Sequence, residues 1–197
     1  MSYKLESNRI DSSGFDIGRW LFRNRGWTPL ALVLGQLVVA EPQNLMWGAA
    51  LLAVGGVVRL ISVASIGPES RTRSTVGAGL VTWGLYGVCR NPLYVGNTLM
   101  WLGFGLWGGW LFAVAWVLFC VGQYALIVSF EERELLRSHG AAYEGYCRRT
   151  PRWAPLGRFH SRKSYCWGLA WRSERSTFLA ILCLSIAQWG PVYHSFF

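Results

Sequence analysis

Residues 94–130 read YVGNTLMWLGFGLWGGWLFAVAWVLFCVGQYALIVSF, an uninterrupted run of 37 residues without a charged side chain. The run begins inside the polar segment Arg90-Asn91-Pro92-Leu93-Tyr94 and is followed directly by Glu131-Glu132. A bilayer core about 30 Å thick takes roughly 20 helical residues to cross, so the run is too long for one crossing and sufficient for a tight hairpin of two. The hairpin predicts that both polar segments lie at the same membrane face.

Composition extends this prediction to the whole chain. Apolar residues make up 52% of the sequence and charged residues only 15%, a balance typical of integral membrane proteins. We therefore predict an all-α fold, a polytopic membrane helix bundle of about five transmembrane helices with a cytoplasmic segment. The hairpin turns within the glycine-rich residues 103–109, and the other spans are predicted at Trp27–Ala40, Leu45–Ile66 and Phe178–Gln188, the last continuing toward Tyr193.

The basic residues give an independent prediction of topology, because Lys and Arg accumulate in loops on the cytoplasmic side. Only Arg59 falls within a predicted span, and every other basic residue falls in segments that the five-span arrangement places on one face. We expect an integral membrane protein with a cytoplasmic N-terminus, in a bacterial or archaeal inner membrane, or in the endoplasmic reticulum of a eukaryote. The net charge of +9 then follows from topology and headgroup attraction rather than from nucleic-acid binding.

Other sequence features favour no further kind of site. Five dispersed cysteines contain no CxxC pair, and the three histidines have no partner spacing typical of a metal site, so we expect no metal and no disulfide framework. Gly77-Ala78-Gly79 lacks the βαβ context of a nucleotide-binding loop.

Four polar blocks flank the hairpin in order. They are Gly84 through Gly96, with Tyr86, Arg90, Asn91, Pro92 and Tyr94 at fixed spacing; Glu131-Glu132 with Leu135; Gly140, Tyr143 and Tyr146; and Pro151-Arg152 with Pro155. Across about residues 67–156 this order resembles the isoprenylcysteine carboxyl methyltransferase family and its relatives among the membrane phospholipid methyltransferases. That family carries G-x-Y-x-x-x-R-[HN]-P-x-Y-x-G, a helix hairpin, E-E-x-x-L, G-x-x-Y-x-x-Y and P-R-x-x-P.

The resemblance implies methyl transfer from S-adenosylmethionine to a hydrophobic or prenylated acceptor among membrane lipids. It implies that the cofactor binds in the cytoplasmic segment through Tyr86, Arg90, Asn91, Pro92, Leu93, Tyr94, Gly96, Asn97, Tyr143 and Tyr146. From the charges of the cofactor we predict Glu131 as a further cofactor-binding residue and Glu132 and Arg152 as catalytic residues. The corresponding regions are an N-terminal segment (1–26), two spans (27–66), the methyltransferase core (67–156) and an interfacial segment leading into the last span (157–197).

The chemistry of this cofactor suits the residues present. A sulfonium cation, an ammonium and a carboxylate need acidic, basic and aromatic partners together. Because adjacent helical residues point about 100° apart, we expect one of Glu131 and Glu132 to face the site, and favour Glu132. We also expect Arg59 to face the bundle interior and support the site, and Glu174 to lie at the surface.

The acceptor stays open at this point. Isoprenylcysteine-type carboxylate O-methylation is the leading hypothesis, because an ionised carboxylate can attack a methyl group without a base. Methylation of a phospholipid amine or a small thiol on the same scaffold is an alternative, and an amine acceptor would need a base such as Glu132. A non-catalytic membrane scaffold or transport protein is the alternative from another class.

Overall fold

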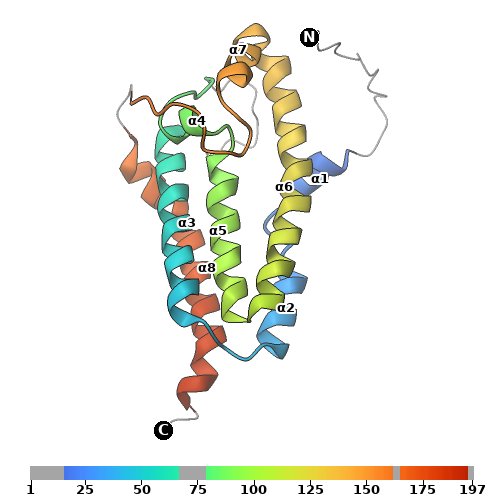
Figure 1. Cartoon of the computed structure of the whole chain (residues 1–197), viewed down its shortest axis with the longest axis vertical. Helices are drawn as coiled ribbons and strands as arrows, with labels where there is room; N and C mark the ends of the chain where they lie inside the picture. The colour runs from blue at the N-terminus through green and yellow to red at the C-terminus, as the bar shows by residue number, and fades with distance from the viewer. Residues whose placement is uncertain (1–15, 67–78, 162–164, 195–197) are drawn as a thin grey trace.

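In a computed structural model, residues 16–66, 79–161 and 165–194 of the chain are described, and this part is all-helical, with no strand (Figure 1). The helices are α1 (Ile17–Asn24), α2 (Leu30–Val39), α3 (Leu45–Ile66), α4 (Leu85–Val88), α5 (Pro92–Trp107), α6 (Trp110–His139), α7 (Ala141–Arg149) and α8 (Trp167–His194). The predicted all-α class is confirmed. The predicted positions of Lys4, Arg9, Arg71 and Arg73, and of the loop before Gly79, lie outside the described residues.

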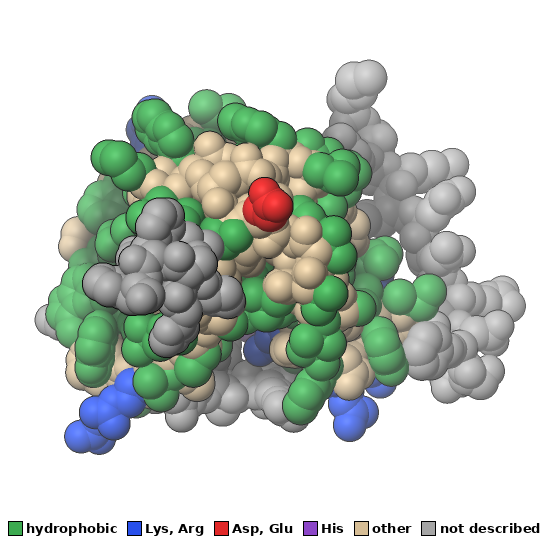
Figure 2. Space-filling model, turned by 90° about the horizontal axis from the view of Figure 1, so that it is seen from below, with side chains coloured by type: hydrophobic (Ala, Val, Ile, Leu, Met, Phe, Trp, Pro, Cys, Tyr) green, Lys and Arg blue, Asp and Glu red, His purple; other side chains and the backbone are tan. Residues whose placement is uncertain are grey.

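The long helices run side by side along the long axis of the molecule, with α4 and α7 together at one end (Figure 1). Helix α1 lies across the side of α6. We call the end that carries α4 and α7 the α7 end. Figure 2 views the opposite end, which is covered mainly by hydrophobic and uncharged groups, with one acidic patch and with Lys and Arg only at its rim.

The predicted reversal between α5 and α6 is confirmed, although the turn is tighter than expected. Helix α5 starts with Pro92 in its first turn, where a missing N–H costs nothing, and continues to Trp107. Only Gly108 and Gly109 form the turn, and Gly109 adopts a φ of 99°, which favours glycine. Gly103 and Gly105 belong to α5 rather than to the turn. Because they have no side chains, α5 approaches α3 at Gly103 and α6 at Gly105 closely.

Within the described part of the chain, two helices, α3 and α6, are long and apolar enough to cross a membrane by length and composition. Helix α3 has the bounds predicted for the second span. Helices α2 and α5, at 10 and 16 residues, are shorter than the roughly 20 residues of a full crossing, and α8 carries charged residues in its first turns. The number of five spans therefore stays a prediction.

The seam between α3 and α5 depends on glycine. A Cβ atom added at Gly55 would lie 2.6 Å from the carbonyl oxygen of Gly96, and one added at Gly96 would lie 2.9 Å from the carbonyl oxygen of Gly55. Farther along the same seam, Gly48 and Gly103 meet in the same way. Small residues that allow backbones to approach this closely are typical of helix packing in membranes.

Replacing Gly55 with alanine should therefore destabilise the protein by about 1–3 kcal/mol, because the new methyl group meets the backbone carbonyl oxygen of Gly96 and the backbone nitrogen of Met100, which cannot move aside as a side chain can. Gly122 in α6 is the matched control, since nothing lies within 4 Å of a Cβ added there. Alanine at Gly122 should leave stability unchanged or raise it by up to about 1 kcal/mol. Thermal unfolding in detergent measures both, and equal shifts for the two variants would contradict the close-approach account.

A buried polar network joins the helices in the half of the bundle opposite the α7 end. Gln36 of α2 is fully buried; its amide nitrogen donates to the carbonyl oxygen of Phe104 at 2.7 Å, and its amide oxygen accepts from the indole nitrogen of Trp116 at 2.9 Å. The same amide nitrogen lies 3.3 Å from the amide oxygen of Gln188 in α8. The network therefore links α2, α5, α6 and α8, and it lies apart from the polar residues of the α7 end.

Candidate functional site

Glu132 of α6 is held between two arginines at the α7 end. One carboxylate oxygen accepts from Nε of Arg90 at 3.1 Å, and Nη2 of Arg90 lies at the same distance. The other oxygen accepts from Nη2 of Arg152. Residues separated in sequence by the whole hairpin thus form one charged cluster, as the prediction that Arg90 and Glu132 lie at the same end required.

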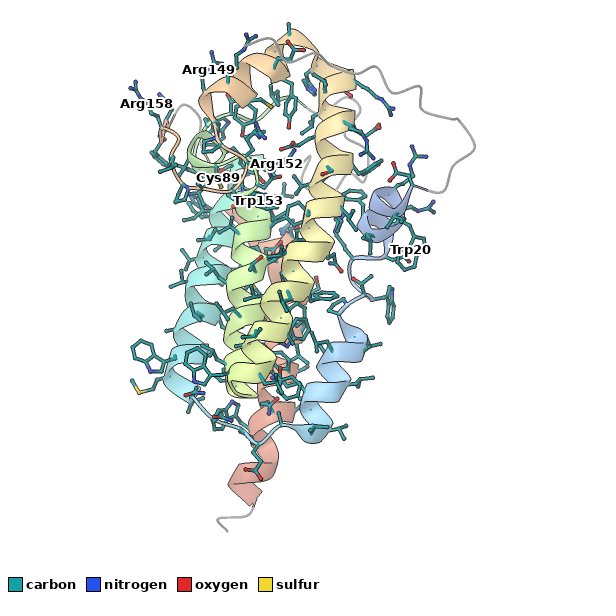
Figure 3. The ribbon with its side chains drawn as sticks, turned by 45° about the vertical axis from the view of Figure 1, so that its right-hand side comes forward. Trp20, Cys89, Arg149, Arg152, Trp153 and Arg158 are labelled. Carbon is teal, nitrogen blue, oxygen red and sulfur yellow. The ribbon has the colours of Figure 1, made fainter. Side chains whose placement is uncertain are left out.

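The three side chains differ in their access to solvent. Glu132 and Arg90 are each 13% exposed, whereas Arg152 is 42% exposed. Figure 3 shows Arg152 and Trp153 at the α7 end together with Cys89, Arg149 and Arg158. The cluster therefore has an inner face fixed by Arg90 and Glu132 and an outer, accessible cation in Arg152.

The chain after α7 folds back along the residues that precede α5. The backbone N–H of Arg90 donates to the carbonyl oxygen of Pro151 at 2.9 Å, and the side-chain amide of Asn91 donates to the carbonyl oxygen of Arg152 at 3.1 Å. Gly157 N–H donates to the carbonyl oxygen of Val88 at 2.8 Å. These bonds hold Arg152 beside Glu132. The side-chain amide of Asn91 thus positions the backbone at Arg152.

Three tyrosines pack α7 against α4. The hydroxyl of Tyr146 donates to the carbonyl oxygen of Tyr86 at 2.7 Å, and the Tyr143 and Tyr146 rings lie 6.0 Å apart. Burial raises the pKa of all three phenols above the ordinary value, so they are neutral at pH 7. Tyr143 and Tyr146 are almost inaccessible and form the wall behind the arginines; direct contact of their rings with a cofactor stays a prediction.

Glu131 has a different partner from Glu132. Its carboxylate accepts from the hydroxyl of Tyr94 at 2.9 Å, and the Tyr94 ring packs on Tyr124 of α6 with centroids 4.8 Å apart. We expected one of the two glutamates to turn away, but each binds a residue of the 90–94 segment. The reason is that this segment changes from a non-helical backbone conformation at Asn91 to helix at Pro92, which presents Arg90 and Tyr94 in different directions.

The remaining predicted residues lie farther along α5. Pro92 occupies the buried helix start, and Leu93 packs against Val63, Ala64 and Ala170, which are core residues of α3 and α8. Gly96 lies in the α3 seam, and Asn97 accepts a hydrogen bond from Arg59. Roles of these four residues in cofactor binding stay predictions, because the structure accounts for each of them by packing or by bonding within the bundle.

Glu174 corrects another expectation. It was expected at the surface, but its side chain is only 3% exposed, and its two oxygens accept from Nε and Nη2 of Arg59 at 2.5 and 3.1 Å. A carboxylate at that depth is retained because a guanidinium pairs with it through two bonds. Arg59 faces the bundle interior, as predicted.

Sequence reasoning missed two residues near the site. Tyr124 lies within the uncharged run, where aromatic residues are ordinary core residues, and Arg25, whose charge acts on Glu131, lies among the basic residues attributed to topology. Only the contact of Tyr124 with Tyr94 identifies it. Cys89 is buried beside the cluster, and burial raises the pKa of its thiol, which excludes a ready thiolate nucleophile at neutral pH.

Together, the α7-end residues suit a small ligand that carries both charges. A carboxylate between two arginines can bind an ammonium while an accessible guanidinium binds a carboxylate. Neutral tyrosines behind them contribute aromatic surface without charge. Such a set is suited to binding and orienting a zwitterionic group, and these residues include no activated nucleophile.

Comparisons with known proteins are consistent with this description. A family model described as phospholipid methyltransferase matches residues 44–142, which extend from the residue before α3 to the first turn of α7. Comparison with curated proteins and with solved structures gave no match.

Proposed function

The chain belongs to the phospholipid methyltransferase family, and from this premise we propose that it is an integral membrane enzyme that transfers a methyl group from S-adenosylmethionine to a lipid-like acceptor. The observation that carries the proposal is the cluster of Arg90, Glu132 and Arg152. Its members come from three of the four sequence blocks, and they suit the amino-acid part of this cofactor.

When bound, S-adenosylmethionine supplies a methyl group on a positively charged sulfur. We assign its carboxylate to Arg152, which is accessible, and its ammonium to Glu132. Arg90 then acts as a positioning residue, since it holds Glu132 and also donates to the carbonyl oxygen of Cys147 at 3.4 Å. Trp153, which is partly exposed beside Arg152, offers a surface on which an adenine ring can stack.

For the acceptor, we propose an ionised carboxylate of the isoprenylcysteine type. A carboxylate oxygen attacks the methyl carbon; the carbon–oxygen bond forms as the carbon–sulfur bond breaks, and the electron pair of that bond stays on sulfur. No proton moves, so the protein contributes alignment and exclusion of water. This agrees with a site in which both oxygens of Glu132 are already engaged by arginines.

A phospholipid amine is the second candidate acceptor, and the description of the matching family model favours it. An ammonium must lose a proton before it can attack, so this reaction needs a base. Glu131 and Glu132 are the carboxylates nearest the start of α5, and each is bonded to another side chain.

We further propose five spans with the α7 end in the cytoplasm. The support is the distribution of charge: the described loops at the opposite end, residues 40–44 and 108–109, contain no Lys or Arg. The α7 end carries Arg90, Arg148, Arg149, Arg152 and Arg158. Basic residues on one face are the signal that sets orientation.

Two experiments test the proposed function. Isothermal titration of the protein in detergent with S-adenosylhomocysteine should show saturable binding, and absence of binding would overturn the proposal. Membranes that contain the protein and radiolabelled S-adenosylmethionine should then transfer label to a lipid-soluble product. Mild alkali should release the label as volatile methanol if a carboxylate is methylated, whereas label on an amine should stay with the product.

A further inference from the structure

A cavity of about 500 Å³ lies between α8 and the group formed by α3, α5 and α6. Apolar and aromatic side chains line most of it: Leu52, Phe104, Trp107, Ile181 and Leu184. Its volume falls within the roughly 300–1,000 Å³ typical of small-molecule sites. The cavity is separate from the Arg90–Glu132–Arg152 cluster, and none of the residues of that cluster lines it.

The cavity persists because α8 is held to the bundle at two distant points. Near one end, Glu174 of α8 pairs with Arg59 of α3, and near the other, Gln188 bonds to Gln36 and to the carbonyl oxygen of Ala40. Between these points α8 presents Thr177, Ala180 and other small or branched side chains toward the space. The arrangement leaves room for a hydrocarbon chain rather than for packed side chains.

One end of the cavity is polar and positively charged. Arg25 and Arg59 both line it, and no Asp or Glu does among the residues that the structure describes. Glu174 compensates Arg59. The Arg25 guanidinium lies 4.3 Å from the Phe22 ring centroid and donates to the Phe22 carbonyl oxygen at 3.1 Å, but it forms no salt bridge with any residue that the structure describes. The polar end therefore carries one cation that forms no salt bridge within the described residues, although the nearby Glu131 carboxylate interacts with it electrostatically.

This polar end adjoins the α7-end residues. Tyr124 lines the cavity and packs on Tyr94, which bonds to Glu131. Asn97 also lines the cavity, and it follows Tyr94 by one helical turn. A molecule with its chain in the apolar part would therefore direct its polar group toward the start of α5.

We propose that this cavity binds the methyl acceptor, and that it selects an amphiphile with one negatively charged group, with Arg25 as the residue that determines this specificity. The inference rests on the proposed function and deepens it. An ammonium would find no Asp or Glu among the described residues that line the cavity, whereas an anion would form charge-assisted hydrogen bonds with Arg25. The negatively charged group of this amphiphile is a carboxylate or a phosphate.

Fluorescence quenching tests the proposal without any cofactor, because Trp101 and Trp107 line the cavity. 9,10-Dibromostearate, whose bromine atoms quench tryptophan at contact, should quench the protein saturably in non-ionic detergent. Its methyl ester should bind about tenfold more weakly, since it lacks the charged hydrogen-bond partner. Equal affinity for acid and ester would overturn the proposal.

Two variants with matched controls locate the site. Arg25→Gln should weaken dibromostearate binding about tenfold and leave the ester unaffected, whereas Arg23→Gln, at an exposed position two residues earlier in the last turn of α1, should change neither. Ala180→Phe, which fills the cavity, should abolish quenching by both probes, while Leu179→Phe, one residue away and exposed, should retain it. Quenching that survives Ala180→Phe would place the amphiphile elsewhere and overturn the proposal.

Competition distinguishes the kinds of head group, and a parallel titration separates the two proposals. Stearate or stearyl phosphate should displace dibromostearate, and which of them does so names the anion; stearylamine displacing it equally well would overturn the selectivity. S-adenosylhomocysteine binding without acid-selective quenching would leave the proposed function standing and refute the cavity assignment. Acid-selective quenching without S-adenosylhomocysteine binding would support the amphiphile site and refute the methyltransferase.

Discussion

Replacing Glu132 with glutamine is expected to reduce methyl transfer about a hundredfold and to leave the helical fold intact. Glutamine keeps the size of the side chain, but it removes the charge and leaves one oxygen to accept from Arg90 and Arg152. Loss of a charged hydrogen-bond partner costs about 1.5–3 kcal/mol, and a factor of one hundred corresponds to about 2.7 kcal/mol. Two guanidinium groups would also be left facing a cofactor that is itself cationic at sulfur.

The measurement combines initial rates with titration of S-adenosylhomocysteine. If Glu132 binds the ammonium, most of the loss should appear as weaker binding of this product and as a higher KM for the methyl donor. Glu134→Gln is the matched control, because Glu134 pairs with Arg137 on the solvent-facing side of the same helix. Full activity of the Glu132 variant, or an equal loss in the control, would remove Glu132 from the site.

The α5–α6 hairpin could be predicted because its physical cause lies within the sequence. A run of 37 uncharged residues has the length and composition of two membrane crossings, and Gly108-Gly109 forms the turn between them. The bounds of α3 follow from composition for the same reason. What composition could not show is that Gly103 packs against a neighbouring helix, since a glycine in a turn and a glycine at a helix interface cannot be told apart until the neighbouring helix is known.

The sequence predicts which segments lie close together at the site, but it does not predict which side chains bond to one another. Once the hairpin is accepted, Arg90 and Glu132 must lie at the same end, and the structure pairs them. The separate partners of Glu131 and Glu132 depend on the change of backbone conformation at Asn91, which residue type does not reveal. The return of residues 151–157 along the chain before α5 depends on backbone hydrogen bonds, which leave no signature in side-chain type.

The burial of Glu174 could not be predicted from its neighbours in sequence. In sequence it stands between arginines in a segment with amphipathic spacing, which is typical of a membrane surface. Its partner Arg59 lies 115 positions earlier, so nothing in its neighbourhood indicates burial. The prediction that Arg59 faces the bundle interior is correct, because a charged residue within an apolar span needs a polar partner. The sequence could not identify that partner.

Replacing Arg59 with methionine should therefore destabilise the protein by about 3–5 kcal/mol, because it leaves the Glu174 carboxylate buried without a counter-charge. For a chain of this length that loss lowers Tm by about 10 °C. Thermal unfolding followed by tryptophan fluorescence in detergent measures the shift. Arg137→Met is the surface control: it removes the exposed ion pair with Glu134 and should cost under about 1 kcal/mol.

The double variant Arg59→Met/Glu174→Met separates the cost of an unpaired charge from the value of the pair. Replacing both members of a buried ion pair with apolar side chains of similar volume is often neutral or stabilising, so the double variant should recover most of the stability that Arg59→Met loses. If it stays as unstable as the single variant, the guanidinium contributes mainly through Asn97 rather than through Glu174. Recovery would show that the stability lost in Arg59→Met comes from the unpaired Glu174 carboxylate and not from loss of packing by the Arg59 side chain.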